Sequence, residues 1–160
     1  MKKIIVILLL TILNVTFTFS QEDGGLQKSN QTSKISKLSY EDIDTKITKT
    51  ISYFFDQIIK KDIELGFEQI LKNSVIALKR DEVKNLKDQT ERSVDIYGEV
   101  LSFEFVSAEM VSNSYLRLRY LALHSSYPMR WVFTYYKSPD KGWIITNIKF
   151  DDLSENFFTD

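Results

Sequence analysis

The chain has 160 residues, with 21 basic and 22 acidic side chains, a net charge of −1 and no cysteine. A chain of this length is expected to form one domain, and the lack of thiols excludes disulfides, thiol catalysis and cysteine-bound metal. The charge balance is not the basic footprint of a protein that binds nucleic acid or an anionic membrane surface. With 43% hydrophobic and 13% aromatic residues, the chain can be stabilised by a packed core.

Residues 1–20 have the layout of a secretory signal peptide. Two lysines precede an apolar run over residues 4–13, and small polar residues follow, with cleavage expected after Ser20. The alternative is a retained membrane anchor, which we disfavour because the run is shorter than the roughly 20 residues that span a bilayer. Residues 21–38 are polar and are interpreted as a flexible spacer. We therefore expect an exported bacterial protein, periplasmic or extracellular, with no stable membrane span after cleavage.

The domain is predicted over residues 39–160, and its first part is helical. Ser39 is expected to cap the first helix, with Asp42 three residues further on as a weak capping box. A broad apolar stripe at helical spacing follows, and Gly98 stands where the last helix should end. The predicted helices cover 39–61, 63–72 and 79–97.

After Gly98 the hydrophobic period changes from that of a helix to that of a strand, and short turns rich in Asn, Pro and Gly separate the strands. Helices followed by a run of strands indicate an α+β domain with helices on one face of an antiparallel sheet. We therefore predict three N-terminal helices packed on a curved, four-stranded antiparallel meander. The predicted strands cover 99–111, 115–125, 130–138 and 143–152.

The apolar pattern predicts the register of the first two strands. Met110 is expected opposite Leu116 and Val106 opposite Tyr120, because a shift by one residue would mix apolar and charged side chains on each face. In this register the apolar face changes side between Phe105 and Val106, which predicts a bulge or strong bend. One apolar half would face the helices, and the other would need a second subunit, the C-terminal tail or a ligand to cover it.

A predicted four-residue turn at 139–142 sets the register of the last hairpin, with Arg130 opposite Asp151, Tyr135 opposite Thr146 and Tyr136 opposite Ile145. One face is then aromatic and is expected to pack on the first helix. The other face is mixed, and a partner or ligand of the sheet is expected to contact it. The aromatic face consists of Trp131, Phe133, Tyr135 and Phe150, and the mixed face contains Val132, Tyr136, Trp143 and Ile145.

The order of elements, ending in GWIITNIKFDD, resembles the nuclear transport factor 2-like superfamily and in particular its small exported bacterial members. The resemblance covers about residues 39–152 and implies a cone-shaped, cystatin-like α+β fold. The superfamily includes isomerases, dehydratases, ligand binders and protein-binding modules, so the resemblance does not select a function. The residues that carry it are Trp131, Phe133, Tyr135, Pro139, Gly142, Trp143 and Phe150.

The resemblance implies that an enzyme of this kind would keep its acid–base groups inside the cone. Glu104 and His124 form one candidate pair for general-base catalysis, and Tyr120 and Tyr135 are further candidates. For Glu104 and His124 we favour the alternative interpretation, that both lie on a polar outer face near the end of the sheet.

Three arginines, Arg117, Arg119 and Arg130, could gather an anionic ligand, but we favour a solvated sheet face with a cross-strand ion pair. The expected pairs are Arg117 opposite Glu109, Arg119 opposite Ser107 and Arg130 opposite Asp151. Asp151 and its neighbour Asp152 resemble half a metal site, and no metal is predicted because no histidine or third acid accompanies them. The sequence contains no phosphate-binding or dinucleotide-binding glycine loop and no metalloprotease or nucleophile-elbow motif, so no cofactor is predicted.

Three hypotheses for the function remain open. The favoured one is a non-catalytic exported domain that binds a small apolar ligand in its cone, or a protein partner or twin subunit on its sheet. The alternatives are an isomerase- or lyase-like enzyme and a structural or inhibitory partner protein. The first is favoured because aromatic surface is abundant and convergent titratable groups are few.

Overall fold

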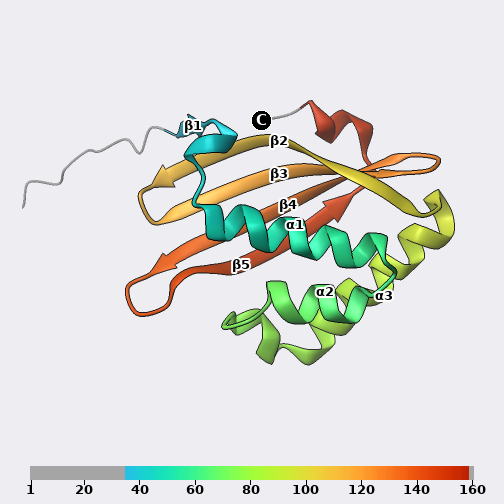
Figure 1. The fold of residues 1–160 in the computed structure, drawn as a ribbon, viewed down its shortest axis with the longest axis horizontal. Helices are drawn as coiled ribbons and strands as arrows, with labels where there is room; N and C mark the ends of the chain where they lie inside the picture. The colour runs from blue at the N-terminus through green and yellow to red at the C-terminus, as the bar shows by residue number, and fades with distance from the viewer. Residues whose placement is uncertain (1–34, 159–160) are drawn as a thin grey trace, which may run out of the picture. The chain divides into compact units, whose positions relative to one another are not determined.

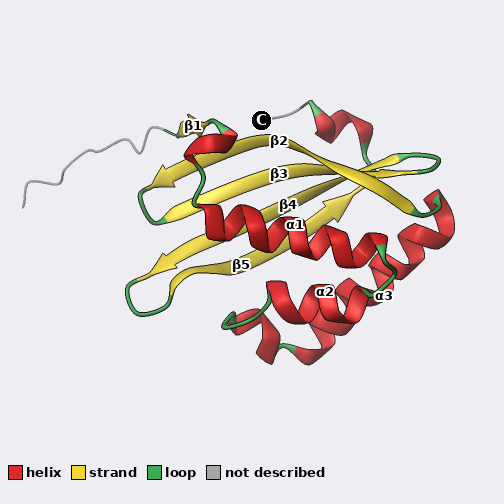
Figure 2. Cartoon of the chain, in the orientation of Figure 1, coloured by secondary structure: helices red, strands yellow, loops and turns green. Residues whose placement is uncertain are grey.

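The computed structural model describes residues 35–158, and these form an α+β domain (Figures 1 and 2). The predicted signal peptide and most of the predicted spacer lie outside the described residues. Within residues 35–158 there are three α-helices and one open, five-stranded antiparallel sheet with its strands in chain order. The helices are α1 (Thr45–Ile59), α2 (Ile63–Ile70) and α3 (Arg80–Tyr97), and the strands are β1 (Ser36–Leu38), β2 (Val100–Ser112), β3 (Tyr115–His124), β4 (Pro128–Ser138) and β5 (Gly142–Asp151).

The strand β1 corrects both the predicted number of strands and the predicted end of the spacer. Residues 36–38 pair with β2, with Leu38 opposite Ala108, and Leu38 packs against the core. Three residues are too few to show the alternation that marks a strand in a sequence. The sheet therefore begins inside the segment that was predicted to be a spacer.

The helix α1 begins at Thr45, which is later than predicted. Ser39 does not cap it, because the Ser39 hydroxyl donates to the Asp42 carboxylate at 2.8 Å and residues 40–42 form a 3-10 turn. The cap is Asp44, whose carboxylate accepts a hydrogen bond from the Lys46 amide at 2.9 Å. An aspartate in this position satisfies one of the free amides at the start of a helix.

The core lies between α1 and the sheet, and α1 runs across one sheet face (Figure 1). Phe54 is at its centre, in edge-to-face contact with Phe67 of α2 and with Trp131 and Phe133 of β4. Trp131 also stacks on Phe150 with ring centroids 4.2 Å apart. The predicted packing of the aromatic hairpin face on the first helix is confirmed.

A bulge at Val106 resolves the phase change that the sequence shows in β2. Met110 lies opposite Leu116 as predicted, but the register shifts between Phe105 and Ser107, so that Phe105 rather than Val106 faces Tyr120. An extra residue restores the alternation beyond it. The apolar side chains on both sides of the bulge therefore face the helices, and the predicted second apolar half of the sheet is wrong. These side chains are Phe103, Phe105, Ala108 and Met110.

The last hairpin keeps its predicted register only from Arg130 to Thr134, and the pairing shifts between Thr134 and Tyr135. The turn has three residues instead of four, because Gly142 already pairs with Ser138 and has a φ of 71°. A left-handed residue after a three-residue loop is typical of such hairpins. Thr146 is then left as the extra residue of β5. The predicted pairs of Tyr135 with Thr146 and Tyr136 with Ile145 are wrong, since the observed partners are Ile145 and Ile144.

Candidate functional site

The candidate pair Glu104 and His124 does not form. The imidazole of His124 is buried and lies on the helix side of β3, opposite Val100. Its Nδ1 is 2.7 Å from the carbonyl oxygen of Gly98, an acceptor, so this nitrogen carries the hydrogen. Glu104 is exposed and points to the other face of the sheet, because the neighbouring Phe103 points toward the helices. The predicted polar outer face therefore holds for Glu104 and is wrong for His124.

The two candidate tyrosines are buried and stay protonated. Burial raises the pKa of Tyr120 and of Tyr135 far above the usual range of a phenol, so neither is suited to act as a base near neutral pH. Tyr120 packs on Phe55 and Phe105. The hydroxyl of Tyr135 is buried and has no hydrogen-bond partner among residues 35–158.

The three candidate arginines bind acids of this chain, as predicted for Arg117 and Arg130, whereas the ion pair of Arg119 was not predicted. The predicted solvated face is wrong at Glu109 and Arg119, which are both buried. Glu109 accepts from both Arg117 and Arg119, at 3.0 Å from Arg119 Nη1. Arg130 donates to Asp151 at 2.6 Å and to the carbonyl of Asn156 at 2.8 Å. These guanidinium groups are engaged within the chain and do not converge on an open site.

The two acids at the end of β5 are engaged as well. Asp151 is bound by Arg130, and Asp152 accepts a hydrogen bond from the Tyr97 hydroxyl, which raises the pKa of Tyr97. Within the described part of the chain, no three His, Asp or Glu side chains gather in a way that could hold a metal ion.

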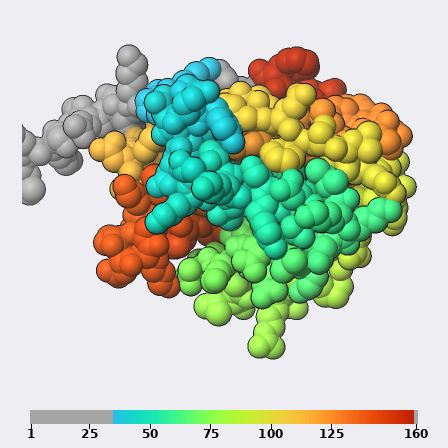
Figure 3. Space-filling model, viewed as in Figure 1, coloured from blue at the N-terminus to red at the C-terminus, as the bar shows by residue number. Residues whose placement is uncertain are grey.

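The structure reveals a different site, a cleft of about 480 Å³ on the helix side of the sheet. It lies where the first half of α1, the end of α2 and the β4–β5 hairpin meet, and Figure 3 shows a hollow between these three segments. We call it the lysine cleft. It is defined by Lys46, Lys49, Lys72, Lys137 and Lys141, with Tyr53, Tyr135 and Trp143 among its other lining residues.

The helix α1 presents two of these lysines because its apolar stripe is turned to the sheet. Ile47 and Ile51 are buried, and side chains three and four residues apart share one side of a helix. Lys46, Lys49 and Tyr53 follow this spacing, and all three line the cleft. One face of α1 therefore packs in the core, and the adjacent side of the same helix lines the cleft.

The loop after α2 is fastened to the edge of the sheet. Asn73 adopts a left-handed conformation with a φ of 65°, which asparagine tolerates better than most residues. The buried hydroxyl of Ser74 then donates to the carbonyl of Ile145 on β5 at 2.6 Å and accepts from the Ile76 amide at 3.1 Å. Because β5 is an edge strand, this bond both covers part of the free edge and holds Lys72 beside the hairpin.

Replacing Ser74 with alanine is expected to lower the free energy of unfolding by about 1–2 kcal/mol, because a buried carbonyl loses its donor. Urea unfolding followed by circular dichroism measures the change. The matched control is Ser126→Ala, at an exposed position, which should stay within about 0.5 kcal/mol of the original protein. Equal midpoints for Ser74→Ala and the original protein would show that the loop is held by other contacts.

The shifted register of the hairpin brings Trp143 into the cleft. Trp143 pairs with Lys137, and the Lys137 ammonium lies 5.7 Å from the centre of the indole ring. Alternate residues of a strand share a face. Lys137 therefore lies on the same face as Tyr135, and Trp143 on the same face as Ile145, which is the face toward the helices. Without the bulge at Thr146, Trp143 would point to the opposite face.

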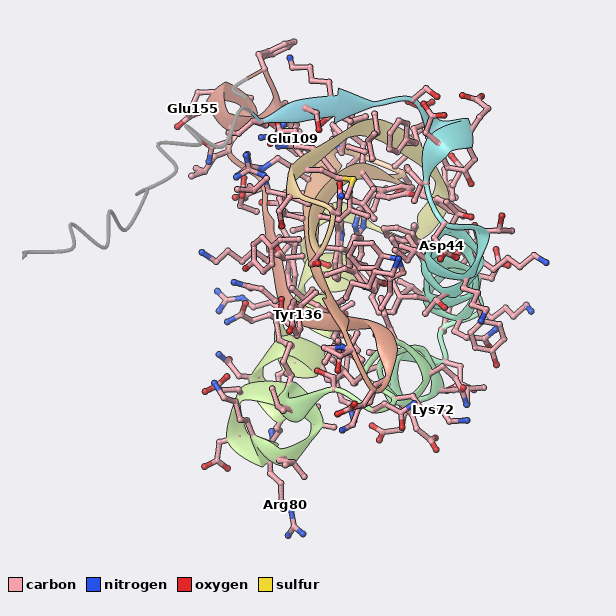
Figure 4. All side chains as sticks on the ribbon, turned by 90° about the vertical axis from the view of Figure 1, so that its left-hand side faces the viewer. Asp44, Lys72, Arg80, Glu109, Tyr136 and Glu155 are labelled. Atoms are coloured by element: carbon pink, nitrogen blue, oxygen red, sulfur yellow. The ribbon has the colours of Figure 1, made fainter. Side chains whose placement is uncertain are left out.

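The four predicted sheet-binding residues are divided between two surfaces. Val132 and Tyr136 lie on the outer face of the sheet, away from the helices, where Val132 lines a second hollow of about 370 Å³. In Figure 4, Tyr136 lies on that side, whereas Asp44 and Lys72 lie on the helix side. Trp143 lines the lysine cleft, and Ile145 is 1% exposed and belongs to the core. The expectation of a shared mixed face is therefore wrong for Trp143 and Ile145.

The lysine cleft carries a concentrated positive charge. Asp44 is the one acid among its described lining residues, and its carboxylate binds the Lys46 amide at the start of α1. None of the five lysine side chains forms an ion pair with any residue in the range 35–158. The chain as a whole has a net charge of −1, so the overall balance conceals this cluster.

No protein-family model, curated protein or solved structure matches the chain. Within residues 35–158 no helix is long and apolar enough to cross a membrane. The lysine cleft combines a concave shape, aromatic lining and a few polar groups, which are the features that binding sites for small molecules share.

Proposed function

We propose that this protein is a non-catalytic, exported binding domain that holds a small ligand with an apolar body in the lysine cleft. The observation that carries this proposal is the position of Trp143, a large, partly exposed ring that lines a cleft of about 480 Å³. Indole rings bind apolar and aromatic groups strongly because they offer a large rigid surface. The volume of the cleft lies within the range of sites for small molecules.

The lining of the cleft supports binding rather than catalysis. Its apolar floor is formed by Ile47 and Ile145, which are buried. The polar residues of its lining are five lysines, two tyrosines, Thr50, Gln69, Asn73 and Asp44, which caps a helix. An isomerase- or lyase-like activity is less well supported, since Glu104 and His124 lie on opposite faces of the sheet.

We also propose that the domain is a cone of the nuclear transport factor 2-like type and that the chain is exported by the signal peptide predicted at residues 1–20. The order of elements supports this fold, because three helices precede an antiparallel meander whose last turn leads into Gly142 and Trp143. In such a cone the lysine cleft would be the opening between the first helix and the last hairpin.

Substitution of Trp143 by alanine tests the proposed site. The probe is N-phenyl-1-naphthylamine, a neutral aromatic dye whose fluorescence rises in apolar surroundings. We expect saturable binding to the original protein and binding about tenfold weaker in Trp143→Ala, which corresponds to the loss of about 1.4 kcal/mol of aromatic contact. Titration of the dye followed by its fluorescence measures both dissociation constants.

The matched control is Tyr136→Ala, which removes a partly exposed ring from the outer face of the same hairpin. It should leave dye binding unchanged. If Tyr136→Ala weakened binding and Trp143→Ala did not, the outer face of the sheet would be the binding surface, as a protein partner or twin subunit would require.

A further inference from the structure

We infer that the ligand of the lysine cleft is an amphipathic anion, a molecule with an apolar or aromatic body and at least one carboxylate, phosphate or sulfonate group. This inference rests on the proposed function, because it specifies the chemical class of the ligand at the same site. Two features of the cleft carry it: its unpaired charge and its aromatic wall.

The first feature is the gathering at one cleft of lysines that have no ion pair within residues 35–158; Lys60 and Lys149 have none either, but they lie outside the cleft. On and near α3, lysines are paired with acids, as in Lys84 with Asp88 at 2.5 Å and Lys87 with Glu64 at 2.6 Å. At the end of α1, Lys61 binds Glu99 at 2.5 Å. The five cleft lysines have no such partner among residues 35–158. Like charges gathered around a concave surface repel one another, and a bound anion relieves this repulsion.

The second feature is the wall of the cleft beside those charges. The indole ring of Trp143 lies on the hairpin side of the cleft, and the Lys137 ammonium is 5.7 Å from its centre. The ring of Tyr53 lies on the α1 side, and 39% of this residue is exposed. A purely inorganic anion would leave these rings in water. A ligand that joins an apolar body to an anionic group satisfies the rings and the lysines together.

The lysine side chains also indicate how the charge is recognised. An ammonium group is a compact point charge on a flexible stem, whereas a guanidinium group fits planar anions through two parallel bonds. The cleft lining contains lysines and no arginine. It is therefore suited to anions of different geometry, and the shared feature of its ligands is charge beside an apolar body.

A pair of dyes that differ by one sulfonate tests the inference. The anionic probe is 8-anilinonaphthalene-1-sulfonate, and the neutral one is N-phenyl-1-naphthylamine. We expect the anionic dye to bind the full chain more tightly at low salt, and the advantage to shrink as sodium chloride approaches molar concentration because salt screens exposed charges.

Variants of the lysines separate a local effect from a general one. Lys72→Gln with Lys141→Gln removes two cleft charges from two different loops and keeps Lys137, the lysine that lies over the Trp143 ring. We expect this double variant to weaken the anionic dye at least about fivefold, the factor of a single charge in contact in water. The neutral dye should keep its affinity. The matched control, Lys60→Gln with Lys149→Gln, makes the same change in net charge at exposed positions outside the cleft and should have no effect.

The outcomes distinguish the inference from the function on which it rests. Equal affinity for both dyes, with binding that still depends on Trp143, would overturn the anionic class and leave the apolar binding site in place. Equal weakening by the control pair and the cleft pair would also overturn it, since the charge effect would then not be local. If neither dye depends on Trp143, both the proposed site and the inference fail. Circular dichroism and thermal unfolding confirm that each variant is folded.

Discussion

Replacing Phe54 with alanine is expected to lower the free energy of unfolding by about 3–5 kcal/mol, the range for a fully buried phenylalanine. Phe54 is 0% exposed, and its ring contacts Phe55, Phe67, Trp131 and Phe133 at centroid distances of 5.2–5.8 Å. The substitution removes the ring that joins α1, α2 and β4. The cavity that it leaves cannot collapse without moving all three elements.

Urea unfolding followed by circular dichroism and by tryptophan emission measures this loss. Trp131 stands next to Phe54, so its emission should shift as water or new packing reaches the site. Phe54→Leu should give a smaller loss of about 1–2 kcal/mol, because most of the volume remains. The matched control is Phe158→Ala, since Phe158 is 90% exposed and should matter little. A loss below about 1 kcal/mol for Phe54→Ala would contradict the packing described for the core.

Replacing Glu109 with glutamine is expected to lower the free energy of unfolding by about 2–3 kcal/mol at neutral pH. The Glu109 side chain is 5% exposed and binds both Arg117 and Arg119, and the Arg119 side chain is itself 7% exposed. The substitution removes the charge that binds the buried Arg119 guanidinium group at 3.0 Å and weakens this ion pair to a neutral hydrogen bond. Because Arg117 is 43% exposed, solvent screens its part of the interaction, and the loss stays below that of a fully buried pair.

The effect of this substitution should depend on pH. Burial alone would raise the pKa of Glu109, but the hydrogen bond from Arg117 and the charge of Arg119 outweigh burial, so its pKa lies below the usual range. A carboxyl group with a lowered pKa in the folded state stabilises the protein above its unfolded pKa, and this contribution is lost as the pH falls through the folded value. The difference between Glu109→Gln and the original protein should therefore be full at neutral pH and shrink as the pH falls below about 4.

The matched control for Glu109 is Glu104→Gln on the same strand and the same face. Glu104 is exposed, so its substitution should change the stability by less than about 0.5 kcal/mol at any pH. Unfolding in urea at several pH values compares the three proteins. A difference for Glu109→Gln that stayed constant down to pH 3 would show that the carboxylate does not stabilise the fold through its charge.

Elements that extend over many residues were predictable from the sequence. The long apolar stripe of α1 and the alternation in β2 to β5 repeat often enough to be unambiguous. The start of α1 was not, because a serine followed by an acid three residues later is compatible with a helix cap and with a local turn, and residues 39–42 form the turn. The strand β1 depends on its neighbour β2, and a three-residue segment carries no pattern of its own.

Register was predictable only between irregularities. One extra residue reverses the side of every residue after it, and shifts occur at Val106 in β2 and at Thr146 in β5. The first shift was foreseen from the phase change, but the second left no trace in the pattern. The shift at Thr146 is the reason why the sequence pattern assigns Trp143 to the outer face of the sheet, whereas the structure places it on the helix side.

The lysine cleft could not be predicted because its parts are distant in sequence and unremarkable singly. Two lysines lie on α1, one follows α2 and two belong to the last hairpin. A count of charges over the whole chain conceals them. A usable sign was present in α1, where Lys49 lies beside the apolar stripe with no acid three or four residues away, the spacing that pairs helical side chains.

The bulge at Val106 also separates the shape of the sheet from its hydrophobic pattern. If Val106 were absent, Phe105 and Ser107 would be adjacent, and every side chain of β2 would keep its present face under plain alternation. The residue is therefore dispensable for placing side chains in the core, and 43% of its own surface is exposed. Its role is mechanical, because an inserted residue increases the local bend and twist of a strand, and β2 turns strongly along its length in Figure 1. The bend of β2 can therefore change by insertion or deletion of one residue at this position, while the apolar alternation of the strand stays the same.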